Sequence, residues 1–274
     1  MRQYSLCGLD IAANEYEIAV LREPASRGGS VGVHEVLQVG QEISISAPRN
    51  EFPLDRESSG RILLFAGGIG ITPIMAMAEA LGHAGPDFEL HYCGRALERM
   101  AYRARLSSGA IADRVTVHLD EGPAEQRLNL ATTLGPWASG DRLYVCGPSG
   151  FIEAVLGAAG QLGWPTAQLN REFFKAPERH GDVDENLPFT VEIGSSGLKF
   201  LIPADRSIAE VLSENGVFIP TSCAEGICGT CVVNLIGGEP DHRDFLLSDA
   251  DKAANSKLTT CCSRAKSDVL VLDL

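Results

Sequence analysis

Residues 220–231 read Pro-Thr-Ser-Cys-Ala-Glu-Gly-Ile-Cys-Gly-Thr-Cys, and a further cysteine, Cys261, follows later in the chain. The cysteines of this stretch, Cys223, Cys228 and Cys231, are spaced Cys-x4-Cys-x2-Cys. The residues between them are mostly small and include two glycines, which adopt backbone conformations that other residues avoid. Such a loop can wrap closely around a small inorganic centre held by thiolates, with backbone N–H groups directed at it.

Three kinds of site use clustered cysteines, and the spacing distinguishes them. Four thiolates with this spacing are typical of a plant-type 2Fe–2S cluster. A structural zinc site usually combines two short Cys-x2-Cys pairs, whereas only one occurs here. A disulfide framework is less expected, because nothing in the sequence indicates secretion. The pattern therefore favours an iron–sulfur cluster.

The fourth ligand is ambiguous by position, because two cysteines are adjacent. The stretch Thr260-Cys261-Cys262-Ser263-Arg264-Ala265 resembles the Cys-Val-Ser-Arg-Ala ending that is common among plant-type ferredoxins. This resemblance implies that Cys261 binds iron and that Cys262 takes the apolar valine position. A free cysteine is a plausible small apolar core residue. The predicted iron ligands are Cys223, Cys228, Cys231 and Cys261.

Composition and charge limit the possible classes of function. The chain has 274 residues, of which 45% are apolar, and this length is enough for two domains or more. Its formal net charge is −13 and its pI is about 4.9, which argues against a nucleic acid or an anionic membrane as partner. The charge would permit docking to a basic patch on a protein, although plain solubility is the more expected explanation.

The sequence also bears on the cellular compartment. No apolar run approaches the roughly 18 residues of a membrane helix, and the first residues do not resemble a signal peptide. The eight cysteines indicate a reducing compartment. We therefore expect a cytoplasmic protein with no membrane partner.

The first 55 residues are expected to form β-structure. Stretches 15–21, 36–39 and 42–46 have strand-like composition and are separated by turns rich in Pro, Gly and Ser. Short strands with glycine turns are typical of a small barrel or sandwich. We therefore predict a partial antiparallel β-barrel over residues 1–55.

Two short motifs lie within this segment: Arg2-Gln-Tyr4-Ser5 and Arg27-Gly28-Gly29-Ser30. Taken alone, the first could be a surface strand and the second a flexible loop. Together they have chemistry suited to a phosphate-bearing ring system. Arginine binds phosphate in a bidentate manner, consecutive backbone N–H groups bind anions, and tyrosine packs on rings.

Residues 56–176 alternate between strand and helix patterns, which is typical of a doubly wound parallel sheet. The apolar run 61–66 predicts a buried strand, and residues 74–81 have a helical pattern. Between them, Gly67-Gly68-Ile-Gly70-Ile-Thr72-Pro73 joins a glycine turn to a proline at a helix start, which can cradle a pyrophosphate. We expect Gly70 to lie where the backbone approaches that pyrophosphate, with no room for a Cβ.

Two later strands of this segment also end in candidate ligand-binding residues. Strand 88–93 is followed by Gly94-Arg95, and strand 142–146 is followed by Gly147-Pro148. Ligands of doubly wound sheets bind at the carboxyl ends of the strands. Arg95, Cys146, Gly147 and Pro148 are therefore candidates for a binding site.

The C-terminal part has the pattern of a small α+β domain. Residues 177–187 are polar and contain Pro and Gly, so they are predicted to be a linker. From residue 188 onward, a hairpin, a helix, the cysteine loop and further strands predict a β-grasp ferredoxin domain. The predicted elements are a hairpin 189–193 with 198–202, helices 207–215 and 249–254, and strands 232–236 and 269–272.

In this order, the motifs resemble the ferredoxin–NADP reductase superfamily. Over essentially the whole chain they resemble reductases of the phthalate dioxygenase type, which also serve vanillate-type demethylases. Ser26 stands where the family's FMN loop usually begins with glycine. The Glu172-Phe173-Phe174 stretch is similar to the family's Glu-x-Phe ending, which implies that Phe174 lies near the flavin. For the other candidates, the resemblance implies flavin binding by Arg2, Tyr4, Ser5, Arg27, Gly28, Gly29 and Ser30, nicotinamide-dinucleotide binding by Gly67, Gly68, Gly70, Thr72 and Pro73, contact with the nicotinamide by Cys146, Gly147 and Pro148, and contact with adenosine by Arg95.

The resemblance also implies a function. Electrons from NADH would pass through FMN and a 2Fe–2S cluster to a terminal Rieske non-haem iron oxygenase or demethylase that degrades aromatic compounds. NADH delivers two electrons together, whereas the cluster accepts them singly, so the flavin stands between them. Alternatives are an electron-relay ferredoxin module with a defective flavin site and a reductase that serves a P450-type acceptor.

One expectation concerns the beginning of the chain. In the family, about three further strands precede the Arg-x-Tyr-Ser strand, whereas here that motif directly follows Met1. We therefore expect an incomplete flavin barrel with unpaired strand edges, and weak binding of FMN.

Overall fold

The computed structural model describes residues 2–8, 14–24, 26, 28–178 and 186–274. Contacts within the chain divide it into two compact units, one over Tyr4–Phe174 and one over Lys175–Leu274, with the first three residues grouped with the second. Each unit is described by itself. Within the described ranges, no helix is both long and apolar enough to cross a membrane. The boundaries predicted at residues 55, 176 and 187 stay predictions.

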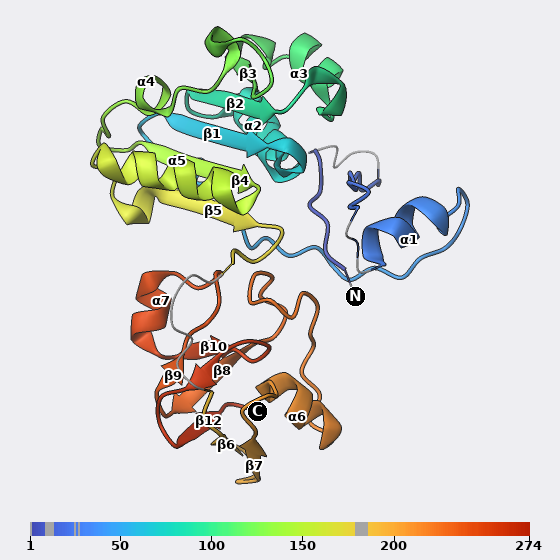
Figure 1. Cartoon of the computed structure of the whole chain (residues 1–274), viewed down its shortest axis with the longest axis vertical. Helices are drawn as coiled ribbons and strands as arrows, with labels where there is room; N and C mark the ends of the chain where they lie inside the picture. The colour runs from blue at the N-terminus through green and yellow to red at the C-terminus, as the bar shows by residue number, and fades with distance from the viewer. Residues whose placement is uncertain (1, 9–13, 25, 27, 179–185) are drawn as a thin grey trace. The chain divides into compact units, whose positions relative to one another are not determined.

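The unit Tyr4–Phe174 is built on a five-stranded, fully parallel sheet (Figure 1). The chain starts at the central strand, adds two strands on one side, and then returns to add two on the other. The strands are β1 Ile62–Gly67, β2 Phe88–Gly94, β3 Val115–Leu119, β4 Arg142–Gly147 and β5 Leu169–Phe173, in the order β3-β2-β1-β4-β5.

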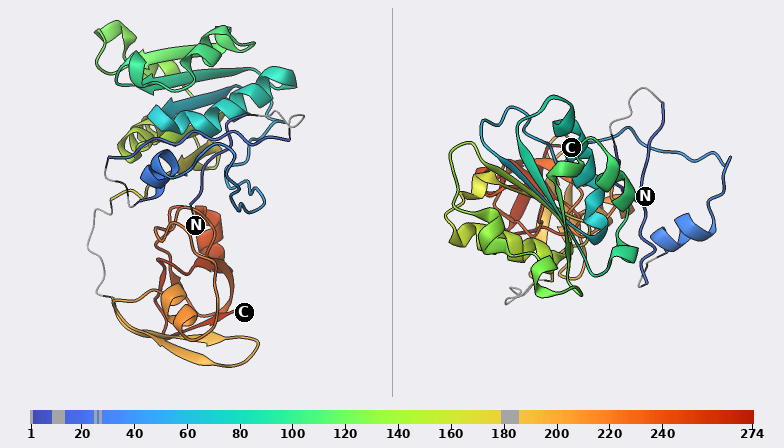
Figure 2. Two further views of the ribbon diagram at one scale, coloured as in Figure 1. Left: turned by 90° about the vertical axis from the view of Figure 1, so that its right-hand side faces the viewer. Right: turned by 90° about the horizontal axis from the view of Figure 1, so that it is seen from above.

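Every residue of β1 is buried, because helices cover both faces of this sheet. Alternate residues of a strand point to opposite faces. Ile62 and Leu64 enter a core that they share with α2 (Ile71–Ala84). Leu63 and Phe65 enter a second core, which they share with α5 (Ser149–Gln161). Figure 2 shows the helical layers on either side of the strands, which confirms the predicted doubly wound arrangement.

Short helical segments complete this unit between the longer elements. Residues 97–108 form a 3-10 turn and a short α-helix, which residues 100–102 separate. These short segments are η2 Gly68–Gly70, η3 Leu97–Arg99, α3 Arg103–Ser108, η4 Ala112–Arg114, η5 Ala124–Gln126, α4 Leu130–Leu134 and η6 Thr166–Gln168.

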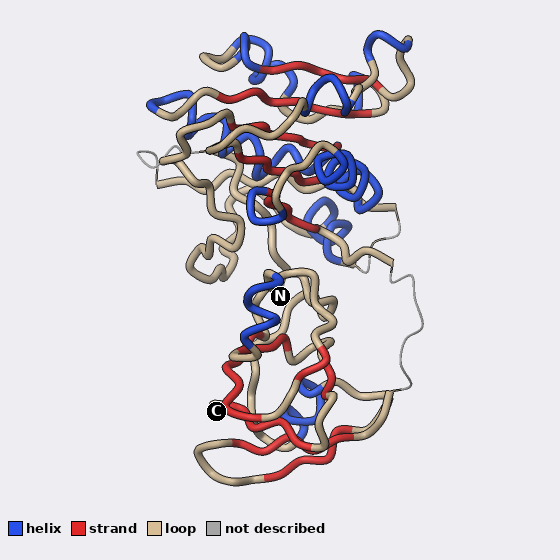
Figure 3. The backbone as a smooth tube through the Cα atoms, turned by 90° about the vertical axis from the view of Figure 1, so that its left-hand side faces the viewer, coloured by secondary structure: helices blue, strands red, loops and turns tan. Residues whose placement is uncertain are grey.

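The strands predicted over 15–21, 36–39 and 42–46 do not form as regular strands in the described residues, and Figure 3 draws most of this part as loop. A strand needs hydrogen bonds from a neighbour, and among the described residues 2–60 only Leu6 and Ile18 form a bridge. The segment has instead one short helix, α1 (Gly29–Glu35). Its strand-like composition therefore leaves several large apolar side chains exposed, namely Tyr16, Ile18, Leu21, Val36, Leu37, Val39, Ile43 and Ile45.

The second unit has a mixed five-stranded sheet in the order β10-β8-β12-β6-β7 and a separate two-stranded sheet. The two strands β6 and β12 pair in parallel, and the other pairs of the larger sheet are antiparallel. The elements are β6 Phe189–Ile193, β7 Lys199–Ile202, α6 Ile208–Glu214, β8 Val232–Gly237, β9 Pro240–Asp241, α7 Asp249–Ala254, β10 Lys257–Thr259, β11 Arg264–Ala265 and β12 Val269–Leu272.

Helix α6 covers the core of this unit and begins at a capping box. The Ser207 hydroxyl accepts a hydrogen bond from the Glu210 N–H, and the Glu210 carboxylate accepts one from the Ser207 N–H. Ser207 is therefore the N-cap residue of this helix. Ile208, Val211 and Leu212 are buried against the sheet. The cysteine loop leads from the end of this helix to β8.

Candidate cofactor and cluster sites

The first candidate site lies where the strand order of the parallel sheet reverses. The chain leaves β1 toward one side of the sheet and leaves β4 toward the other, so the carboxyl ends of these two strands form the topological switch point. Ligands of doubly wound sheets bind in the crevice at this point. Gly67 ends β1 and Gly147 ends β4, so the structure brings the two predicted nicotinamide motifs together there.

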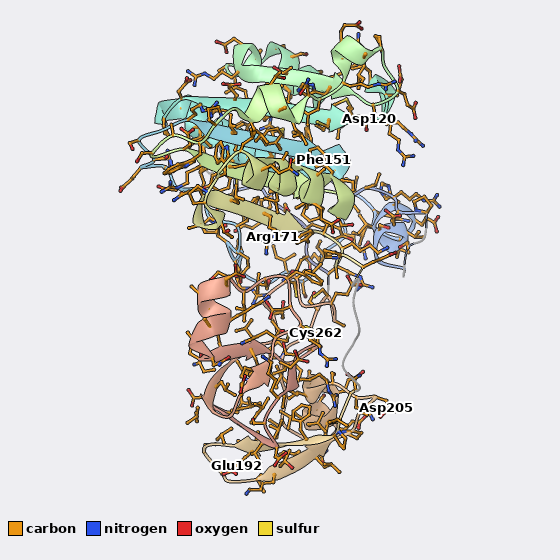
Figure 4. The ribbon with its side chains drawn as sticks, turned by 60° about the vertical axis from the view of Figure 1, so that its left-hand side comes forward. Asp120, Phe151, Arg171, Glu192, Asp205 and Cys262 are labelled. Atoms are coloured by element: carbon orange, nitrogen blue, oxygen red, sulfur yellow. The ribbon has the colours of Figure 1, made fainter. Side chains whose placement is uncertain are left out.

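The glycines of these two turns allow backbone to pack on backbone. A Cβ on Gly67 would lie 2.9 Å from the Phe151 ring, and one on Gly147 would lie 3.0 Å from the Gly67 Cα. Phe151 is labelled on α5 in Figure 4. A Cβ on Gly70 would overlap the carbonyl group of Cys146. Gly70 therefore has no room for a Cβ, as predicted, because β4 fills the space beside it. Approach of its backbone to a pyrophosphate stays a prediction.

Only part of the first turn, residues 67–73, is accessible at the surface. Gly68 has a φ of +54°, and nothing lies within 4 Å of the position that its Cβ would take. Thr72 is buried and its hydroxyl donates to the Ile69 carbonyl oxygen at 3.1 Å, while Pro73 is buried in the first turn of α2. Gly68 and Ile69 are the part available to a ligand, and Thr72 and Pro73 shape the turn from behind.

In the second turn Pro148 and part of Gly147 are accessible, whereas the preceding Cys146 is buried. The Cys146 thiol is fully buried, and burial raises its pKa well above the ordinary value. Gly147 is half-buried and Pro148 is exposed. Contact between Cys146 and a nicotinamide ring stays a prediction, and Gly147 and Pro148 are the accessible members of this motif.

One residue of this site was missed in the sequence, although it is part of the Glu-x-Phe pattern. Glu172 pairs with Cys146 across β4 and β5. Its Oε2 atom is buried and has no hydrogen-bond partner among the described residues, and burial raises the pKa of this carboxyl to about 7. Glu172 can therefore hold or release a proton near neutral pH at the switch point. Only its place beside β4, which the sequence does not show, distinguishes it from a surface glutamate.

Two further candidates lie at the same edge of the sheet. Arg95 is exposed directly after β2, and its carbonyl oxygen accepts from the Glu121 N–H at 3.2 Å, so the turns after β2 and β3 are joined. Phe174 follows β5 and is 41% exposed. Both positions are accessible to a ligand, and their predicted roles toward adenosine and flavin stay predictions.

The predicted flavin residues lie in the N-terminal segment. Arg2 is exposed, and Tyr4 and Ser5 are half-buried. Gly28, with a φ of +91°, precedes the helix that begins with Gly29 and Ser30. Arg27 lies outside the described residues. Among the described residues of the two motifs, no hydrogen bond or ion pair joins residues 2–5 to residues 28–30, so their joint action on a flavin stays a prediction.

The cysteine loop is folded so that its backbone faces sulfur. Ala224, Gly226 and Gly229 have φ values of 58°, 72° and 71°, which bend the loop sharply. The Glu225 N–H donates to the Cys223 Sγ at 3.3 Å. Backbone donors directed at sulfur are the surroundings that a thiolate-bound cluster needs. The residues present therefore fit a 2Fe–2S cluster.

The four predicted ligands interact through their side chains. The Cys223 thiol is hydrogen bonded to those of Cys228 and Cys261, and these bonds lower its pKa. A hydrogen bond from Cys261 lowers the pKa of Cys231 to about 7. The same contacts raise the pKa of Cys228 and Cys261, so the neighbouring thiols share protons that a bound metal would displace. In the described ranges no three His, Cys, Asp or Glu side chains converge as a single-ion site requires, whereas a two-iron cluster needs its thiolates spread around a larger core.

Cys262 has different surroundings from Cys261. Cys261 interacts with both Cys223 and Cys231. The Cys262 Sγ lies 3.2 Å from the Thr259 hydroxyl and 2.5 Å from the position that a Gly226 Cβ would take. This geometry favours Cys261 as the fourth ligand and places Cys262 behind the loop.

A parallel sheet with a glycine-lined switch point and a ferredoxin unit in one chain define an iron–sulfur oxidoreductase. The 2Fe-2S iron-sulfur cluster binding domain family matches residues 191–266. Vanillate O-demethylase oxidoreductase of Pseudomonas sp. (strain HR199 / DSM 7063) is 51% identical over 274 residues, covering all of this chain and 86% of the relative. Phthalate dioxygenase reductase of Burkholderia cepacia is 40% identical, with 100% and 83% covered. The chain belongs to the family of oxygenase reductases that includes these two proteins.

Solved structures agree with this assignment. A structure titled as phthalate dioxygenase reductase, a modular structure for electron transfer from pyridine nucleotides to [2Fe-2S], matches all of this chain and 83% of its own, with 39% identity and a TM-score of 0.66. An intact type IV self-sufficient cytochrome P450 monooxygenase matches with 37% identity and a TM-score of 0.90, and the match covers all of this chain and 35% of that one. The family and the multidomain fold class predicted from the sequence are thereby confirmed.

The packing at the switch point predicts different effects for two neighbouring glycines. Gly70→Ala should lower the free energy of unfolding by about 2–4 kcal/mol, because its Cβ would overlap the Cys146 carbonyl group. Gly68→Ala should cost about 1–2 kcal/mol through backbone strain alone. Urea denaturation of both variants measures these effects. Equal losses in the two variants would contradict the packing described here.

The raised pKa of Glu172 predicts that the stability of the folded chain depends on pH. Between about pH 4.5 and pH 7 the unfolded chain loses this proton while the folded chain keeps it, so folding stability falls as pH rises through this window. Glu172→Gln should therefore stabilise its unit by about 1–3 kcal/mol at pH 8 and have little effect at pH 4. Denaturant titrations at both pH values provide the measurement, with the exposed Glu153→Gln as control. A gain of the same size at both pH values would refute the assignment.

Proposed function

We propose that this chain is the reductase component of a Rieske-type oxygenase or demethylase system, carrying electrons from NADH through FMN and a 2Fe–2S cluster. The observation that carries this proposal is the 51% identity to a vanillate O-demethylase oxidoreductase over the whole chain, together with a cysteine loop whose backbone faces sulfur. When bound, FMN would supply the link between NADH, a two-electron donor, and the cluster, a one-electron acceptor.

The chain's own residues have separate roles in this scheme. Gly68, Gly147 and Pro148 leave backbone accessible at the switch point, where a nicotinamide dinucleotide would lie. Glu172 holds a proton at Oε2 beside that point, and Phe174 gives an accessible aromatic face at the end of β5. In the second unit, Cys223, Cys228, Cys231 and Cys261 hold the cluster.

The oxygenase partner and its substrate follow from the relatives' names only in general terms. Relatives named for vanillate and phthalate chemistry support an aromatic substrate. Others are named a carnitine monooxygenase reductase subunit and a tert-butanol monooxygenase reductase subunit, which indicates that the reductase does not select the substrate. We assign aromatic degradation to this system. We also assign the cytoplasm, because thiolates and NADH suit a reducing compartment.

A second candidate acceptor is a cytochrome P450. The self-sufficient P450 monooxygenase that aligns with this chain has the higher TM-score of the two structures compared above, 0.90 against 0.66. In that P450 monooxygenase, the region that matches this chain is 35% of one longer chain. A P450 would therefore be a physically plausible electron acceptor for this chain as well. The Rieske assignment is preferred because full-length relatives of similar size are named for demethylase and dioxygenase systems.

The test of this function uses the full chain, with its flavin and iron contents measured, together with an oxygenase as electron acceptor. NADH should reduce the cluster and support turnover by a Rieske oxygenase component, with less support from NADPH. Turnover by a P450 and not by a Rieske component would favour the second candidate. A cluster that dithionite reduces but NADH does not would contradict the proposal and indicate a relay module.

Cluster ligation is tested by serine substitution. Replacement of Cys223, Cys228, Cys231 or Cys261 should abolish the cluster's visible absorption, because a hydroxyl is a much poorer iron ligand than a thiolate. Cys262→Ser is the matched control and should keep the spectrum. Loss of the cluster in Cys262→Ser with an intact cluster in Cys261→Ser would reverse the assignment of the fourth ligand.

A further inference from the structure

Asp244 is a fully buried acidic side chain in the second unit, between β9 and α7. Its Oδ2 atom accepts hydrogen bonds from the N–H groups of Leu246 at 3.1 Å and Leu247 at 2.7 Å. The Lys252 Nζ lies 3.9 Å from the same oxygen and donates to the Asp244 carbonyl oxygen at 2.8 Å. The two N–H donors and the nearby cation therefore face one of the two carboxylate oxygens.

The backbone around Asp244 packs directly on the cysteine loop. The Phe245 N–H donates to the Gly226 carbonyl oxygen at 3.0 Å. A Cβ on Gly226 would lie 2.9 Å from the Asp244 Cα and 2.5 Å from the Cys262 Sγ. Gly226 is within the Cys-x4-Cys interval, so Asp244 lies against the loop that carries the predicted ligands. Figure 4 labels Cys262 in this part of the chain.

The negative charge of Asp244 is only partly compensated. Its second oxygen, Oδ1, is buried and has no hydrogen-bond partner among the described residues. The His242 Nδ1 lies 3.8 Å from Oδ1 and is also buried, with no hydrogen-bond partner of its own among the described residues. An unpaired buried carboxylate oxygen is costly to maintain, so its place beside the cysteine loop calls for an explanation.

We propose that Asp244 lowers the reduction potential of the cluster, by holding an only partly compensated negative charge beside the loop that binds it. This inference rests on the proposed ligation by the four cysteines. Reduction adds one electron and hence one negative charge to the cluster. A nearby carboxylate in a poorly solvated position opposes that charge, and net charge is one of the factors that set cluster potentials. Lys252 acts in the opposite direction, because its cation offsets part of the Asp244 charge.

The test is the midpoint potential of the cluster in the full chain, followed by visible absorption during a redox titration. Asp244→Asn keeps the size of the side chain and an oxygen for the two N–H groups, and it should move the potential to a more positive value. The matched control is Asp249→Asn, which removes the same charge from an exposed position at the start of α7. The control should move the potential less than Asp244→Asn does.

Lys252→Met provides an independent second variant. It leaves the Asp244 charge in place and less compensated, so the potential should move to a more negative value. Opposite shifts of the potential would support the proposal. A general disturbance of the loop would not shift the potential in opposite directions according to whether a negative or a positive charge is removed. Shifts in the same direction, or an unchanged potential in Lys252→Met, would overturn it even if Asp244→Asn fails to assemble a cluster. Absence of the cluster from the unsubstituted chain would instead refute the proposed function.

Discussion

The close contact between the turn after β1 and the end of β4 is the constraint on which the nicotinamide-type unit depends. Gly70 lies directly against the carbonyl group of Cys146, and Gly67 and Gly147 approach each other with no space for side chains. Because parallel strands end at the same edge of the sheet, this contact determines the shape of the switch point. The ligand-accessible backbone at Gly68 is available only because the residues around it are packed so closely.

The cysteine loop depends on the same kind of packing. Gly226 has a left-handed backbone and lies against Asp244 and Cys262, where a Cβ would be too close. The positive φ values of Ala224 and Gly229 add to the bend. In both units, glycines therefore let backbone groups, and not long side chains, form the walls of the site.

Among the described residues, each unit has one buried carboxylate oxygen without a hydrogen-bond partner close to its candidate site. Glu172 lies beside Cys146 at the switch point, and Asp244 lies beside the cysteine loop. Their environments differ, because burial raises the pKa of Glu172 to about 7, whereas Asp244 accepts two backbone hydrogen bonds and faces Lys252. Burial therefore favours the protonated form of Glu172, whereas the Asp244 side chain lies among hydrogen-bond donors and a cation.

The sequence alone was sufficient for the family, the doubly wound parallel sheet and the 2Fe–2S domain, since short-range spacing and apolar periodicity are local properties. Helix α7 and strand β12 were predicted with the bounds that they have. The strands predicted before residue 50 were wrong, because a strand is stabilised by a neighbour that local composition cannot reveal. Only the tertiary structure showed why Gly70 must lack a side chain, and that Glu172 and Asp244 lie beside the two sites. These properties depend on contacts between residues far apart in the chain, such as Gly226 with Asp244, which local patterns in a single sequence do not determine.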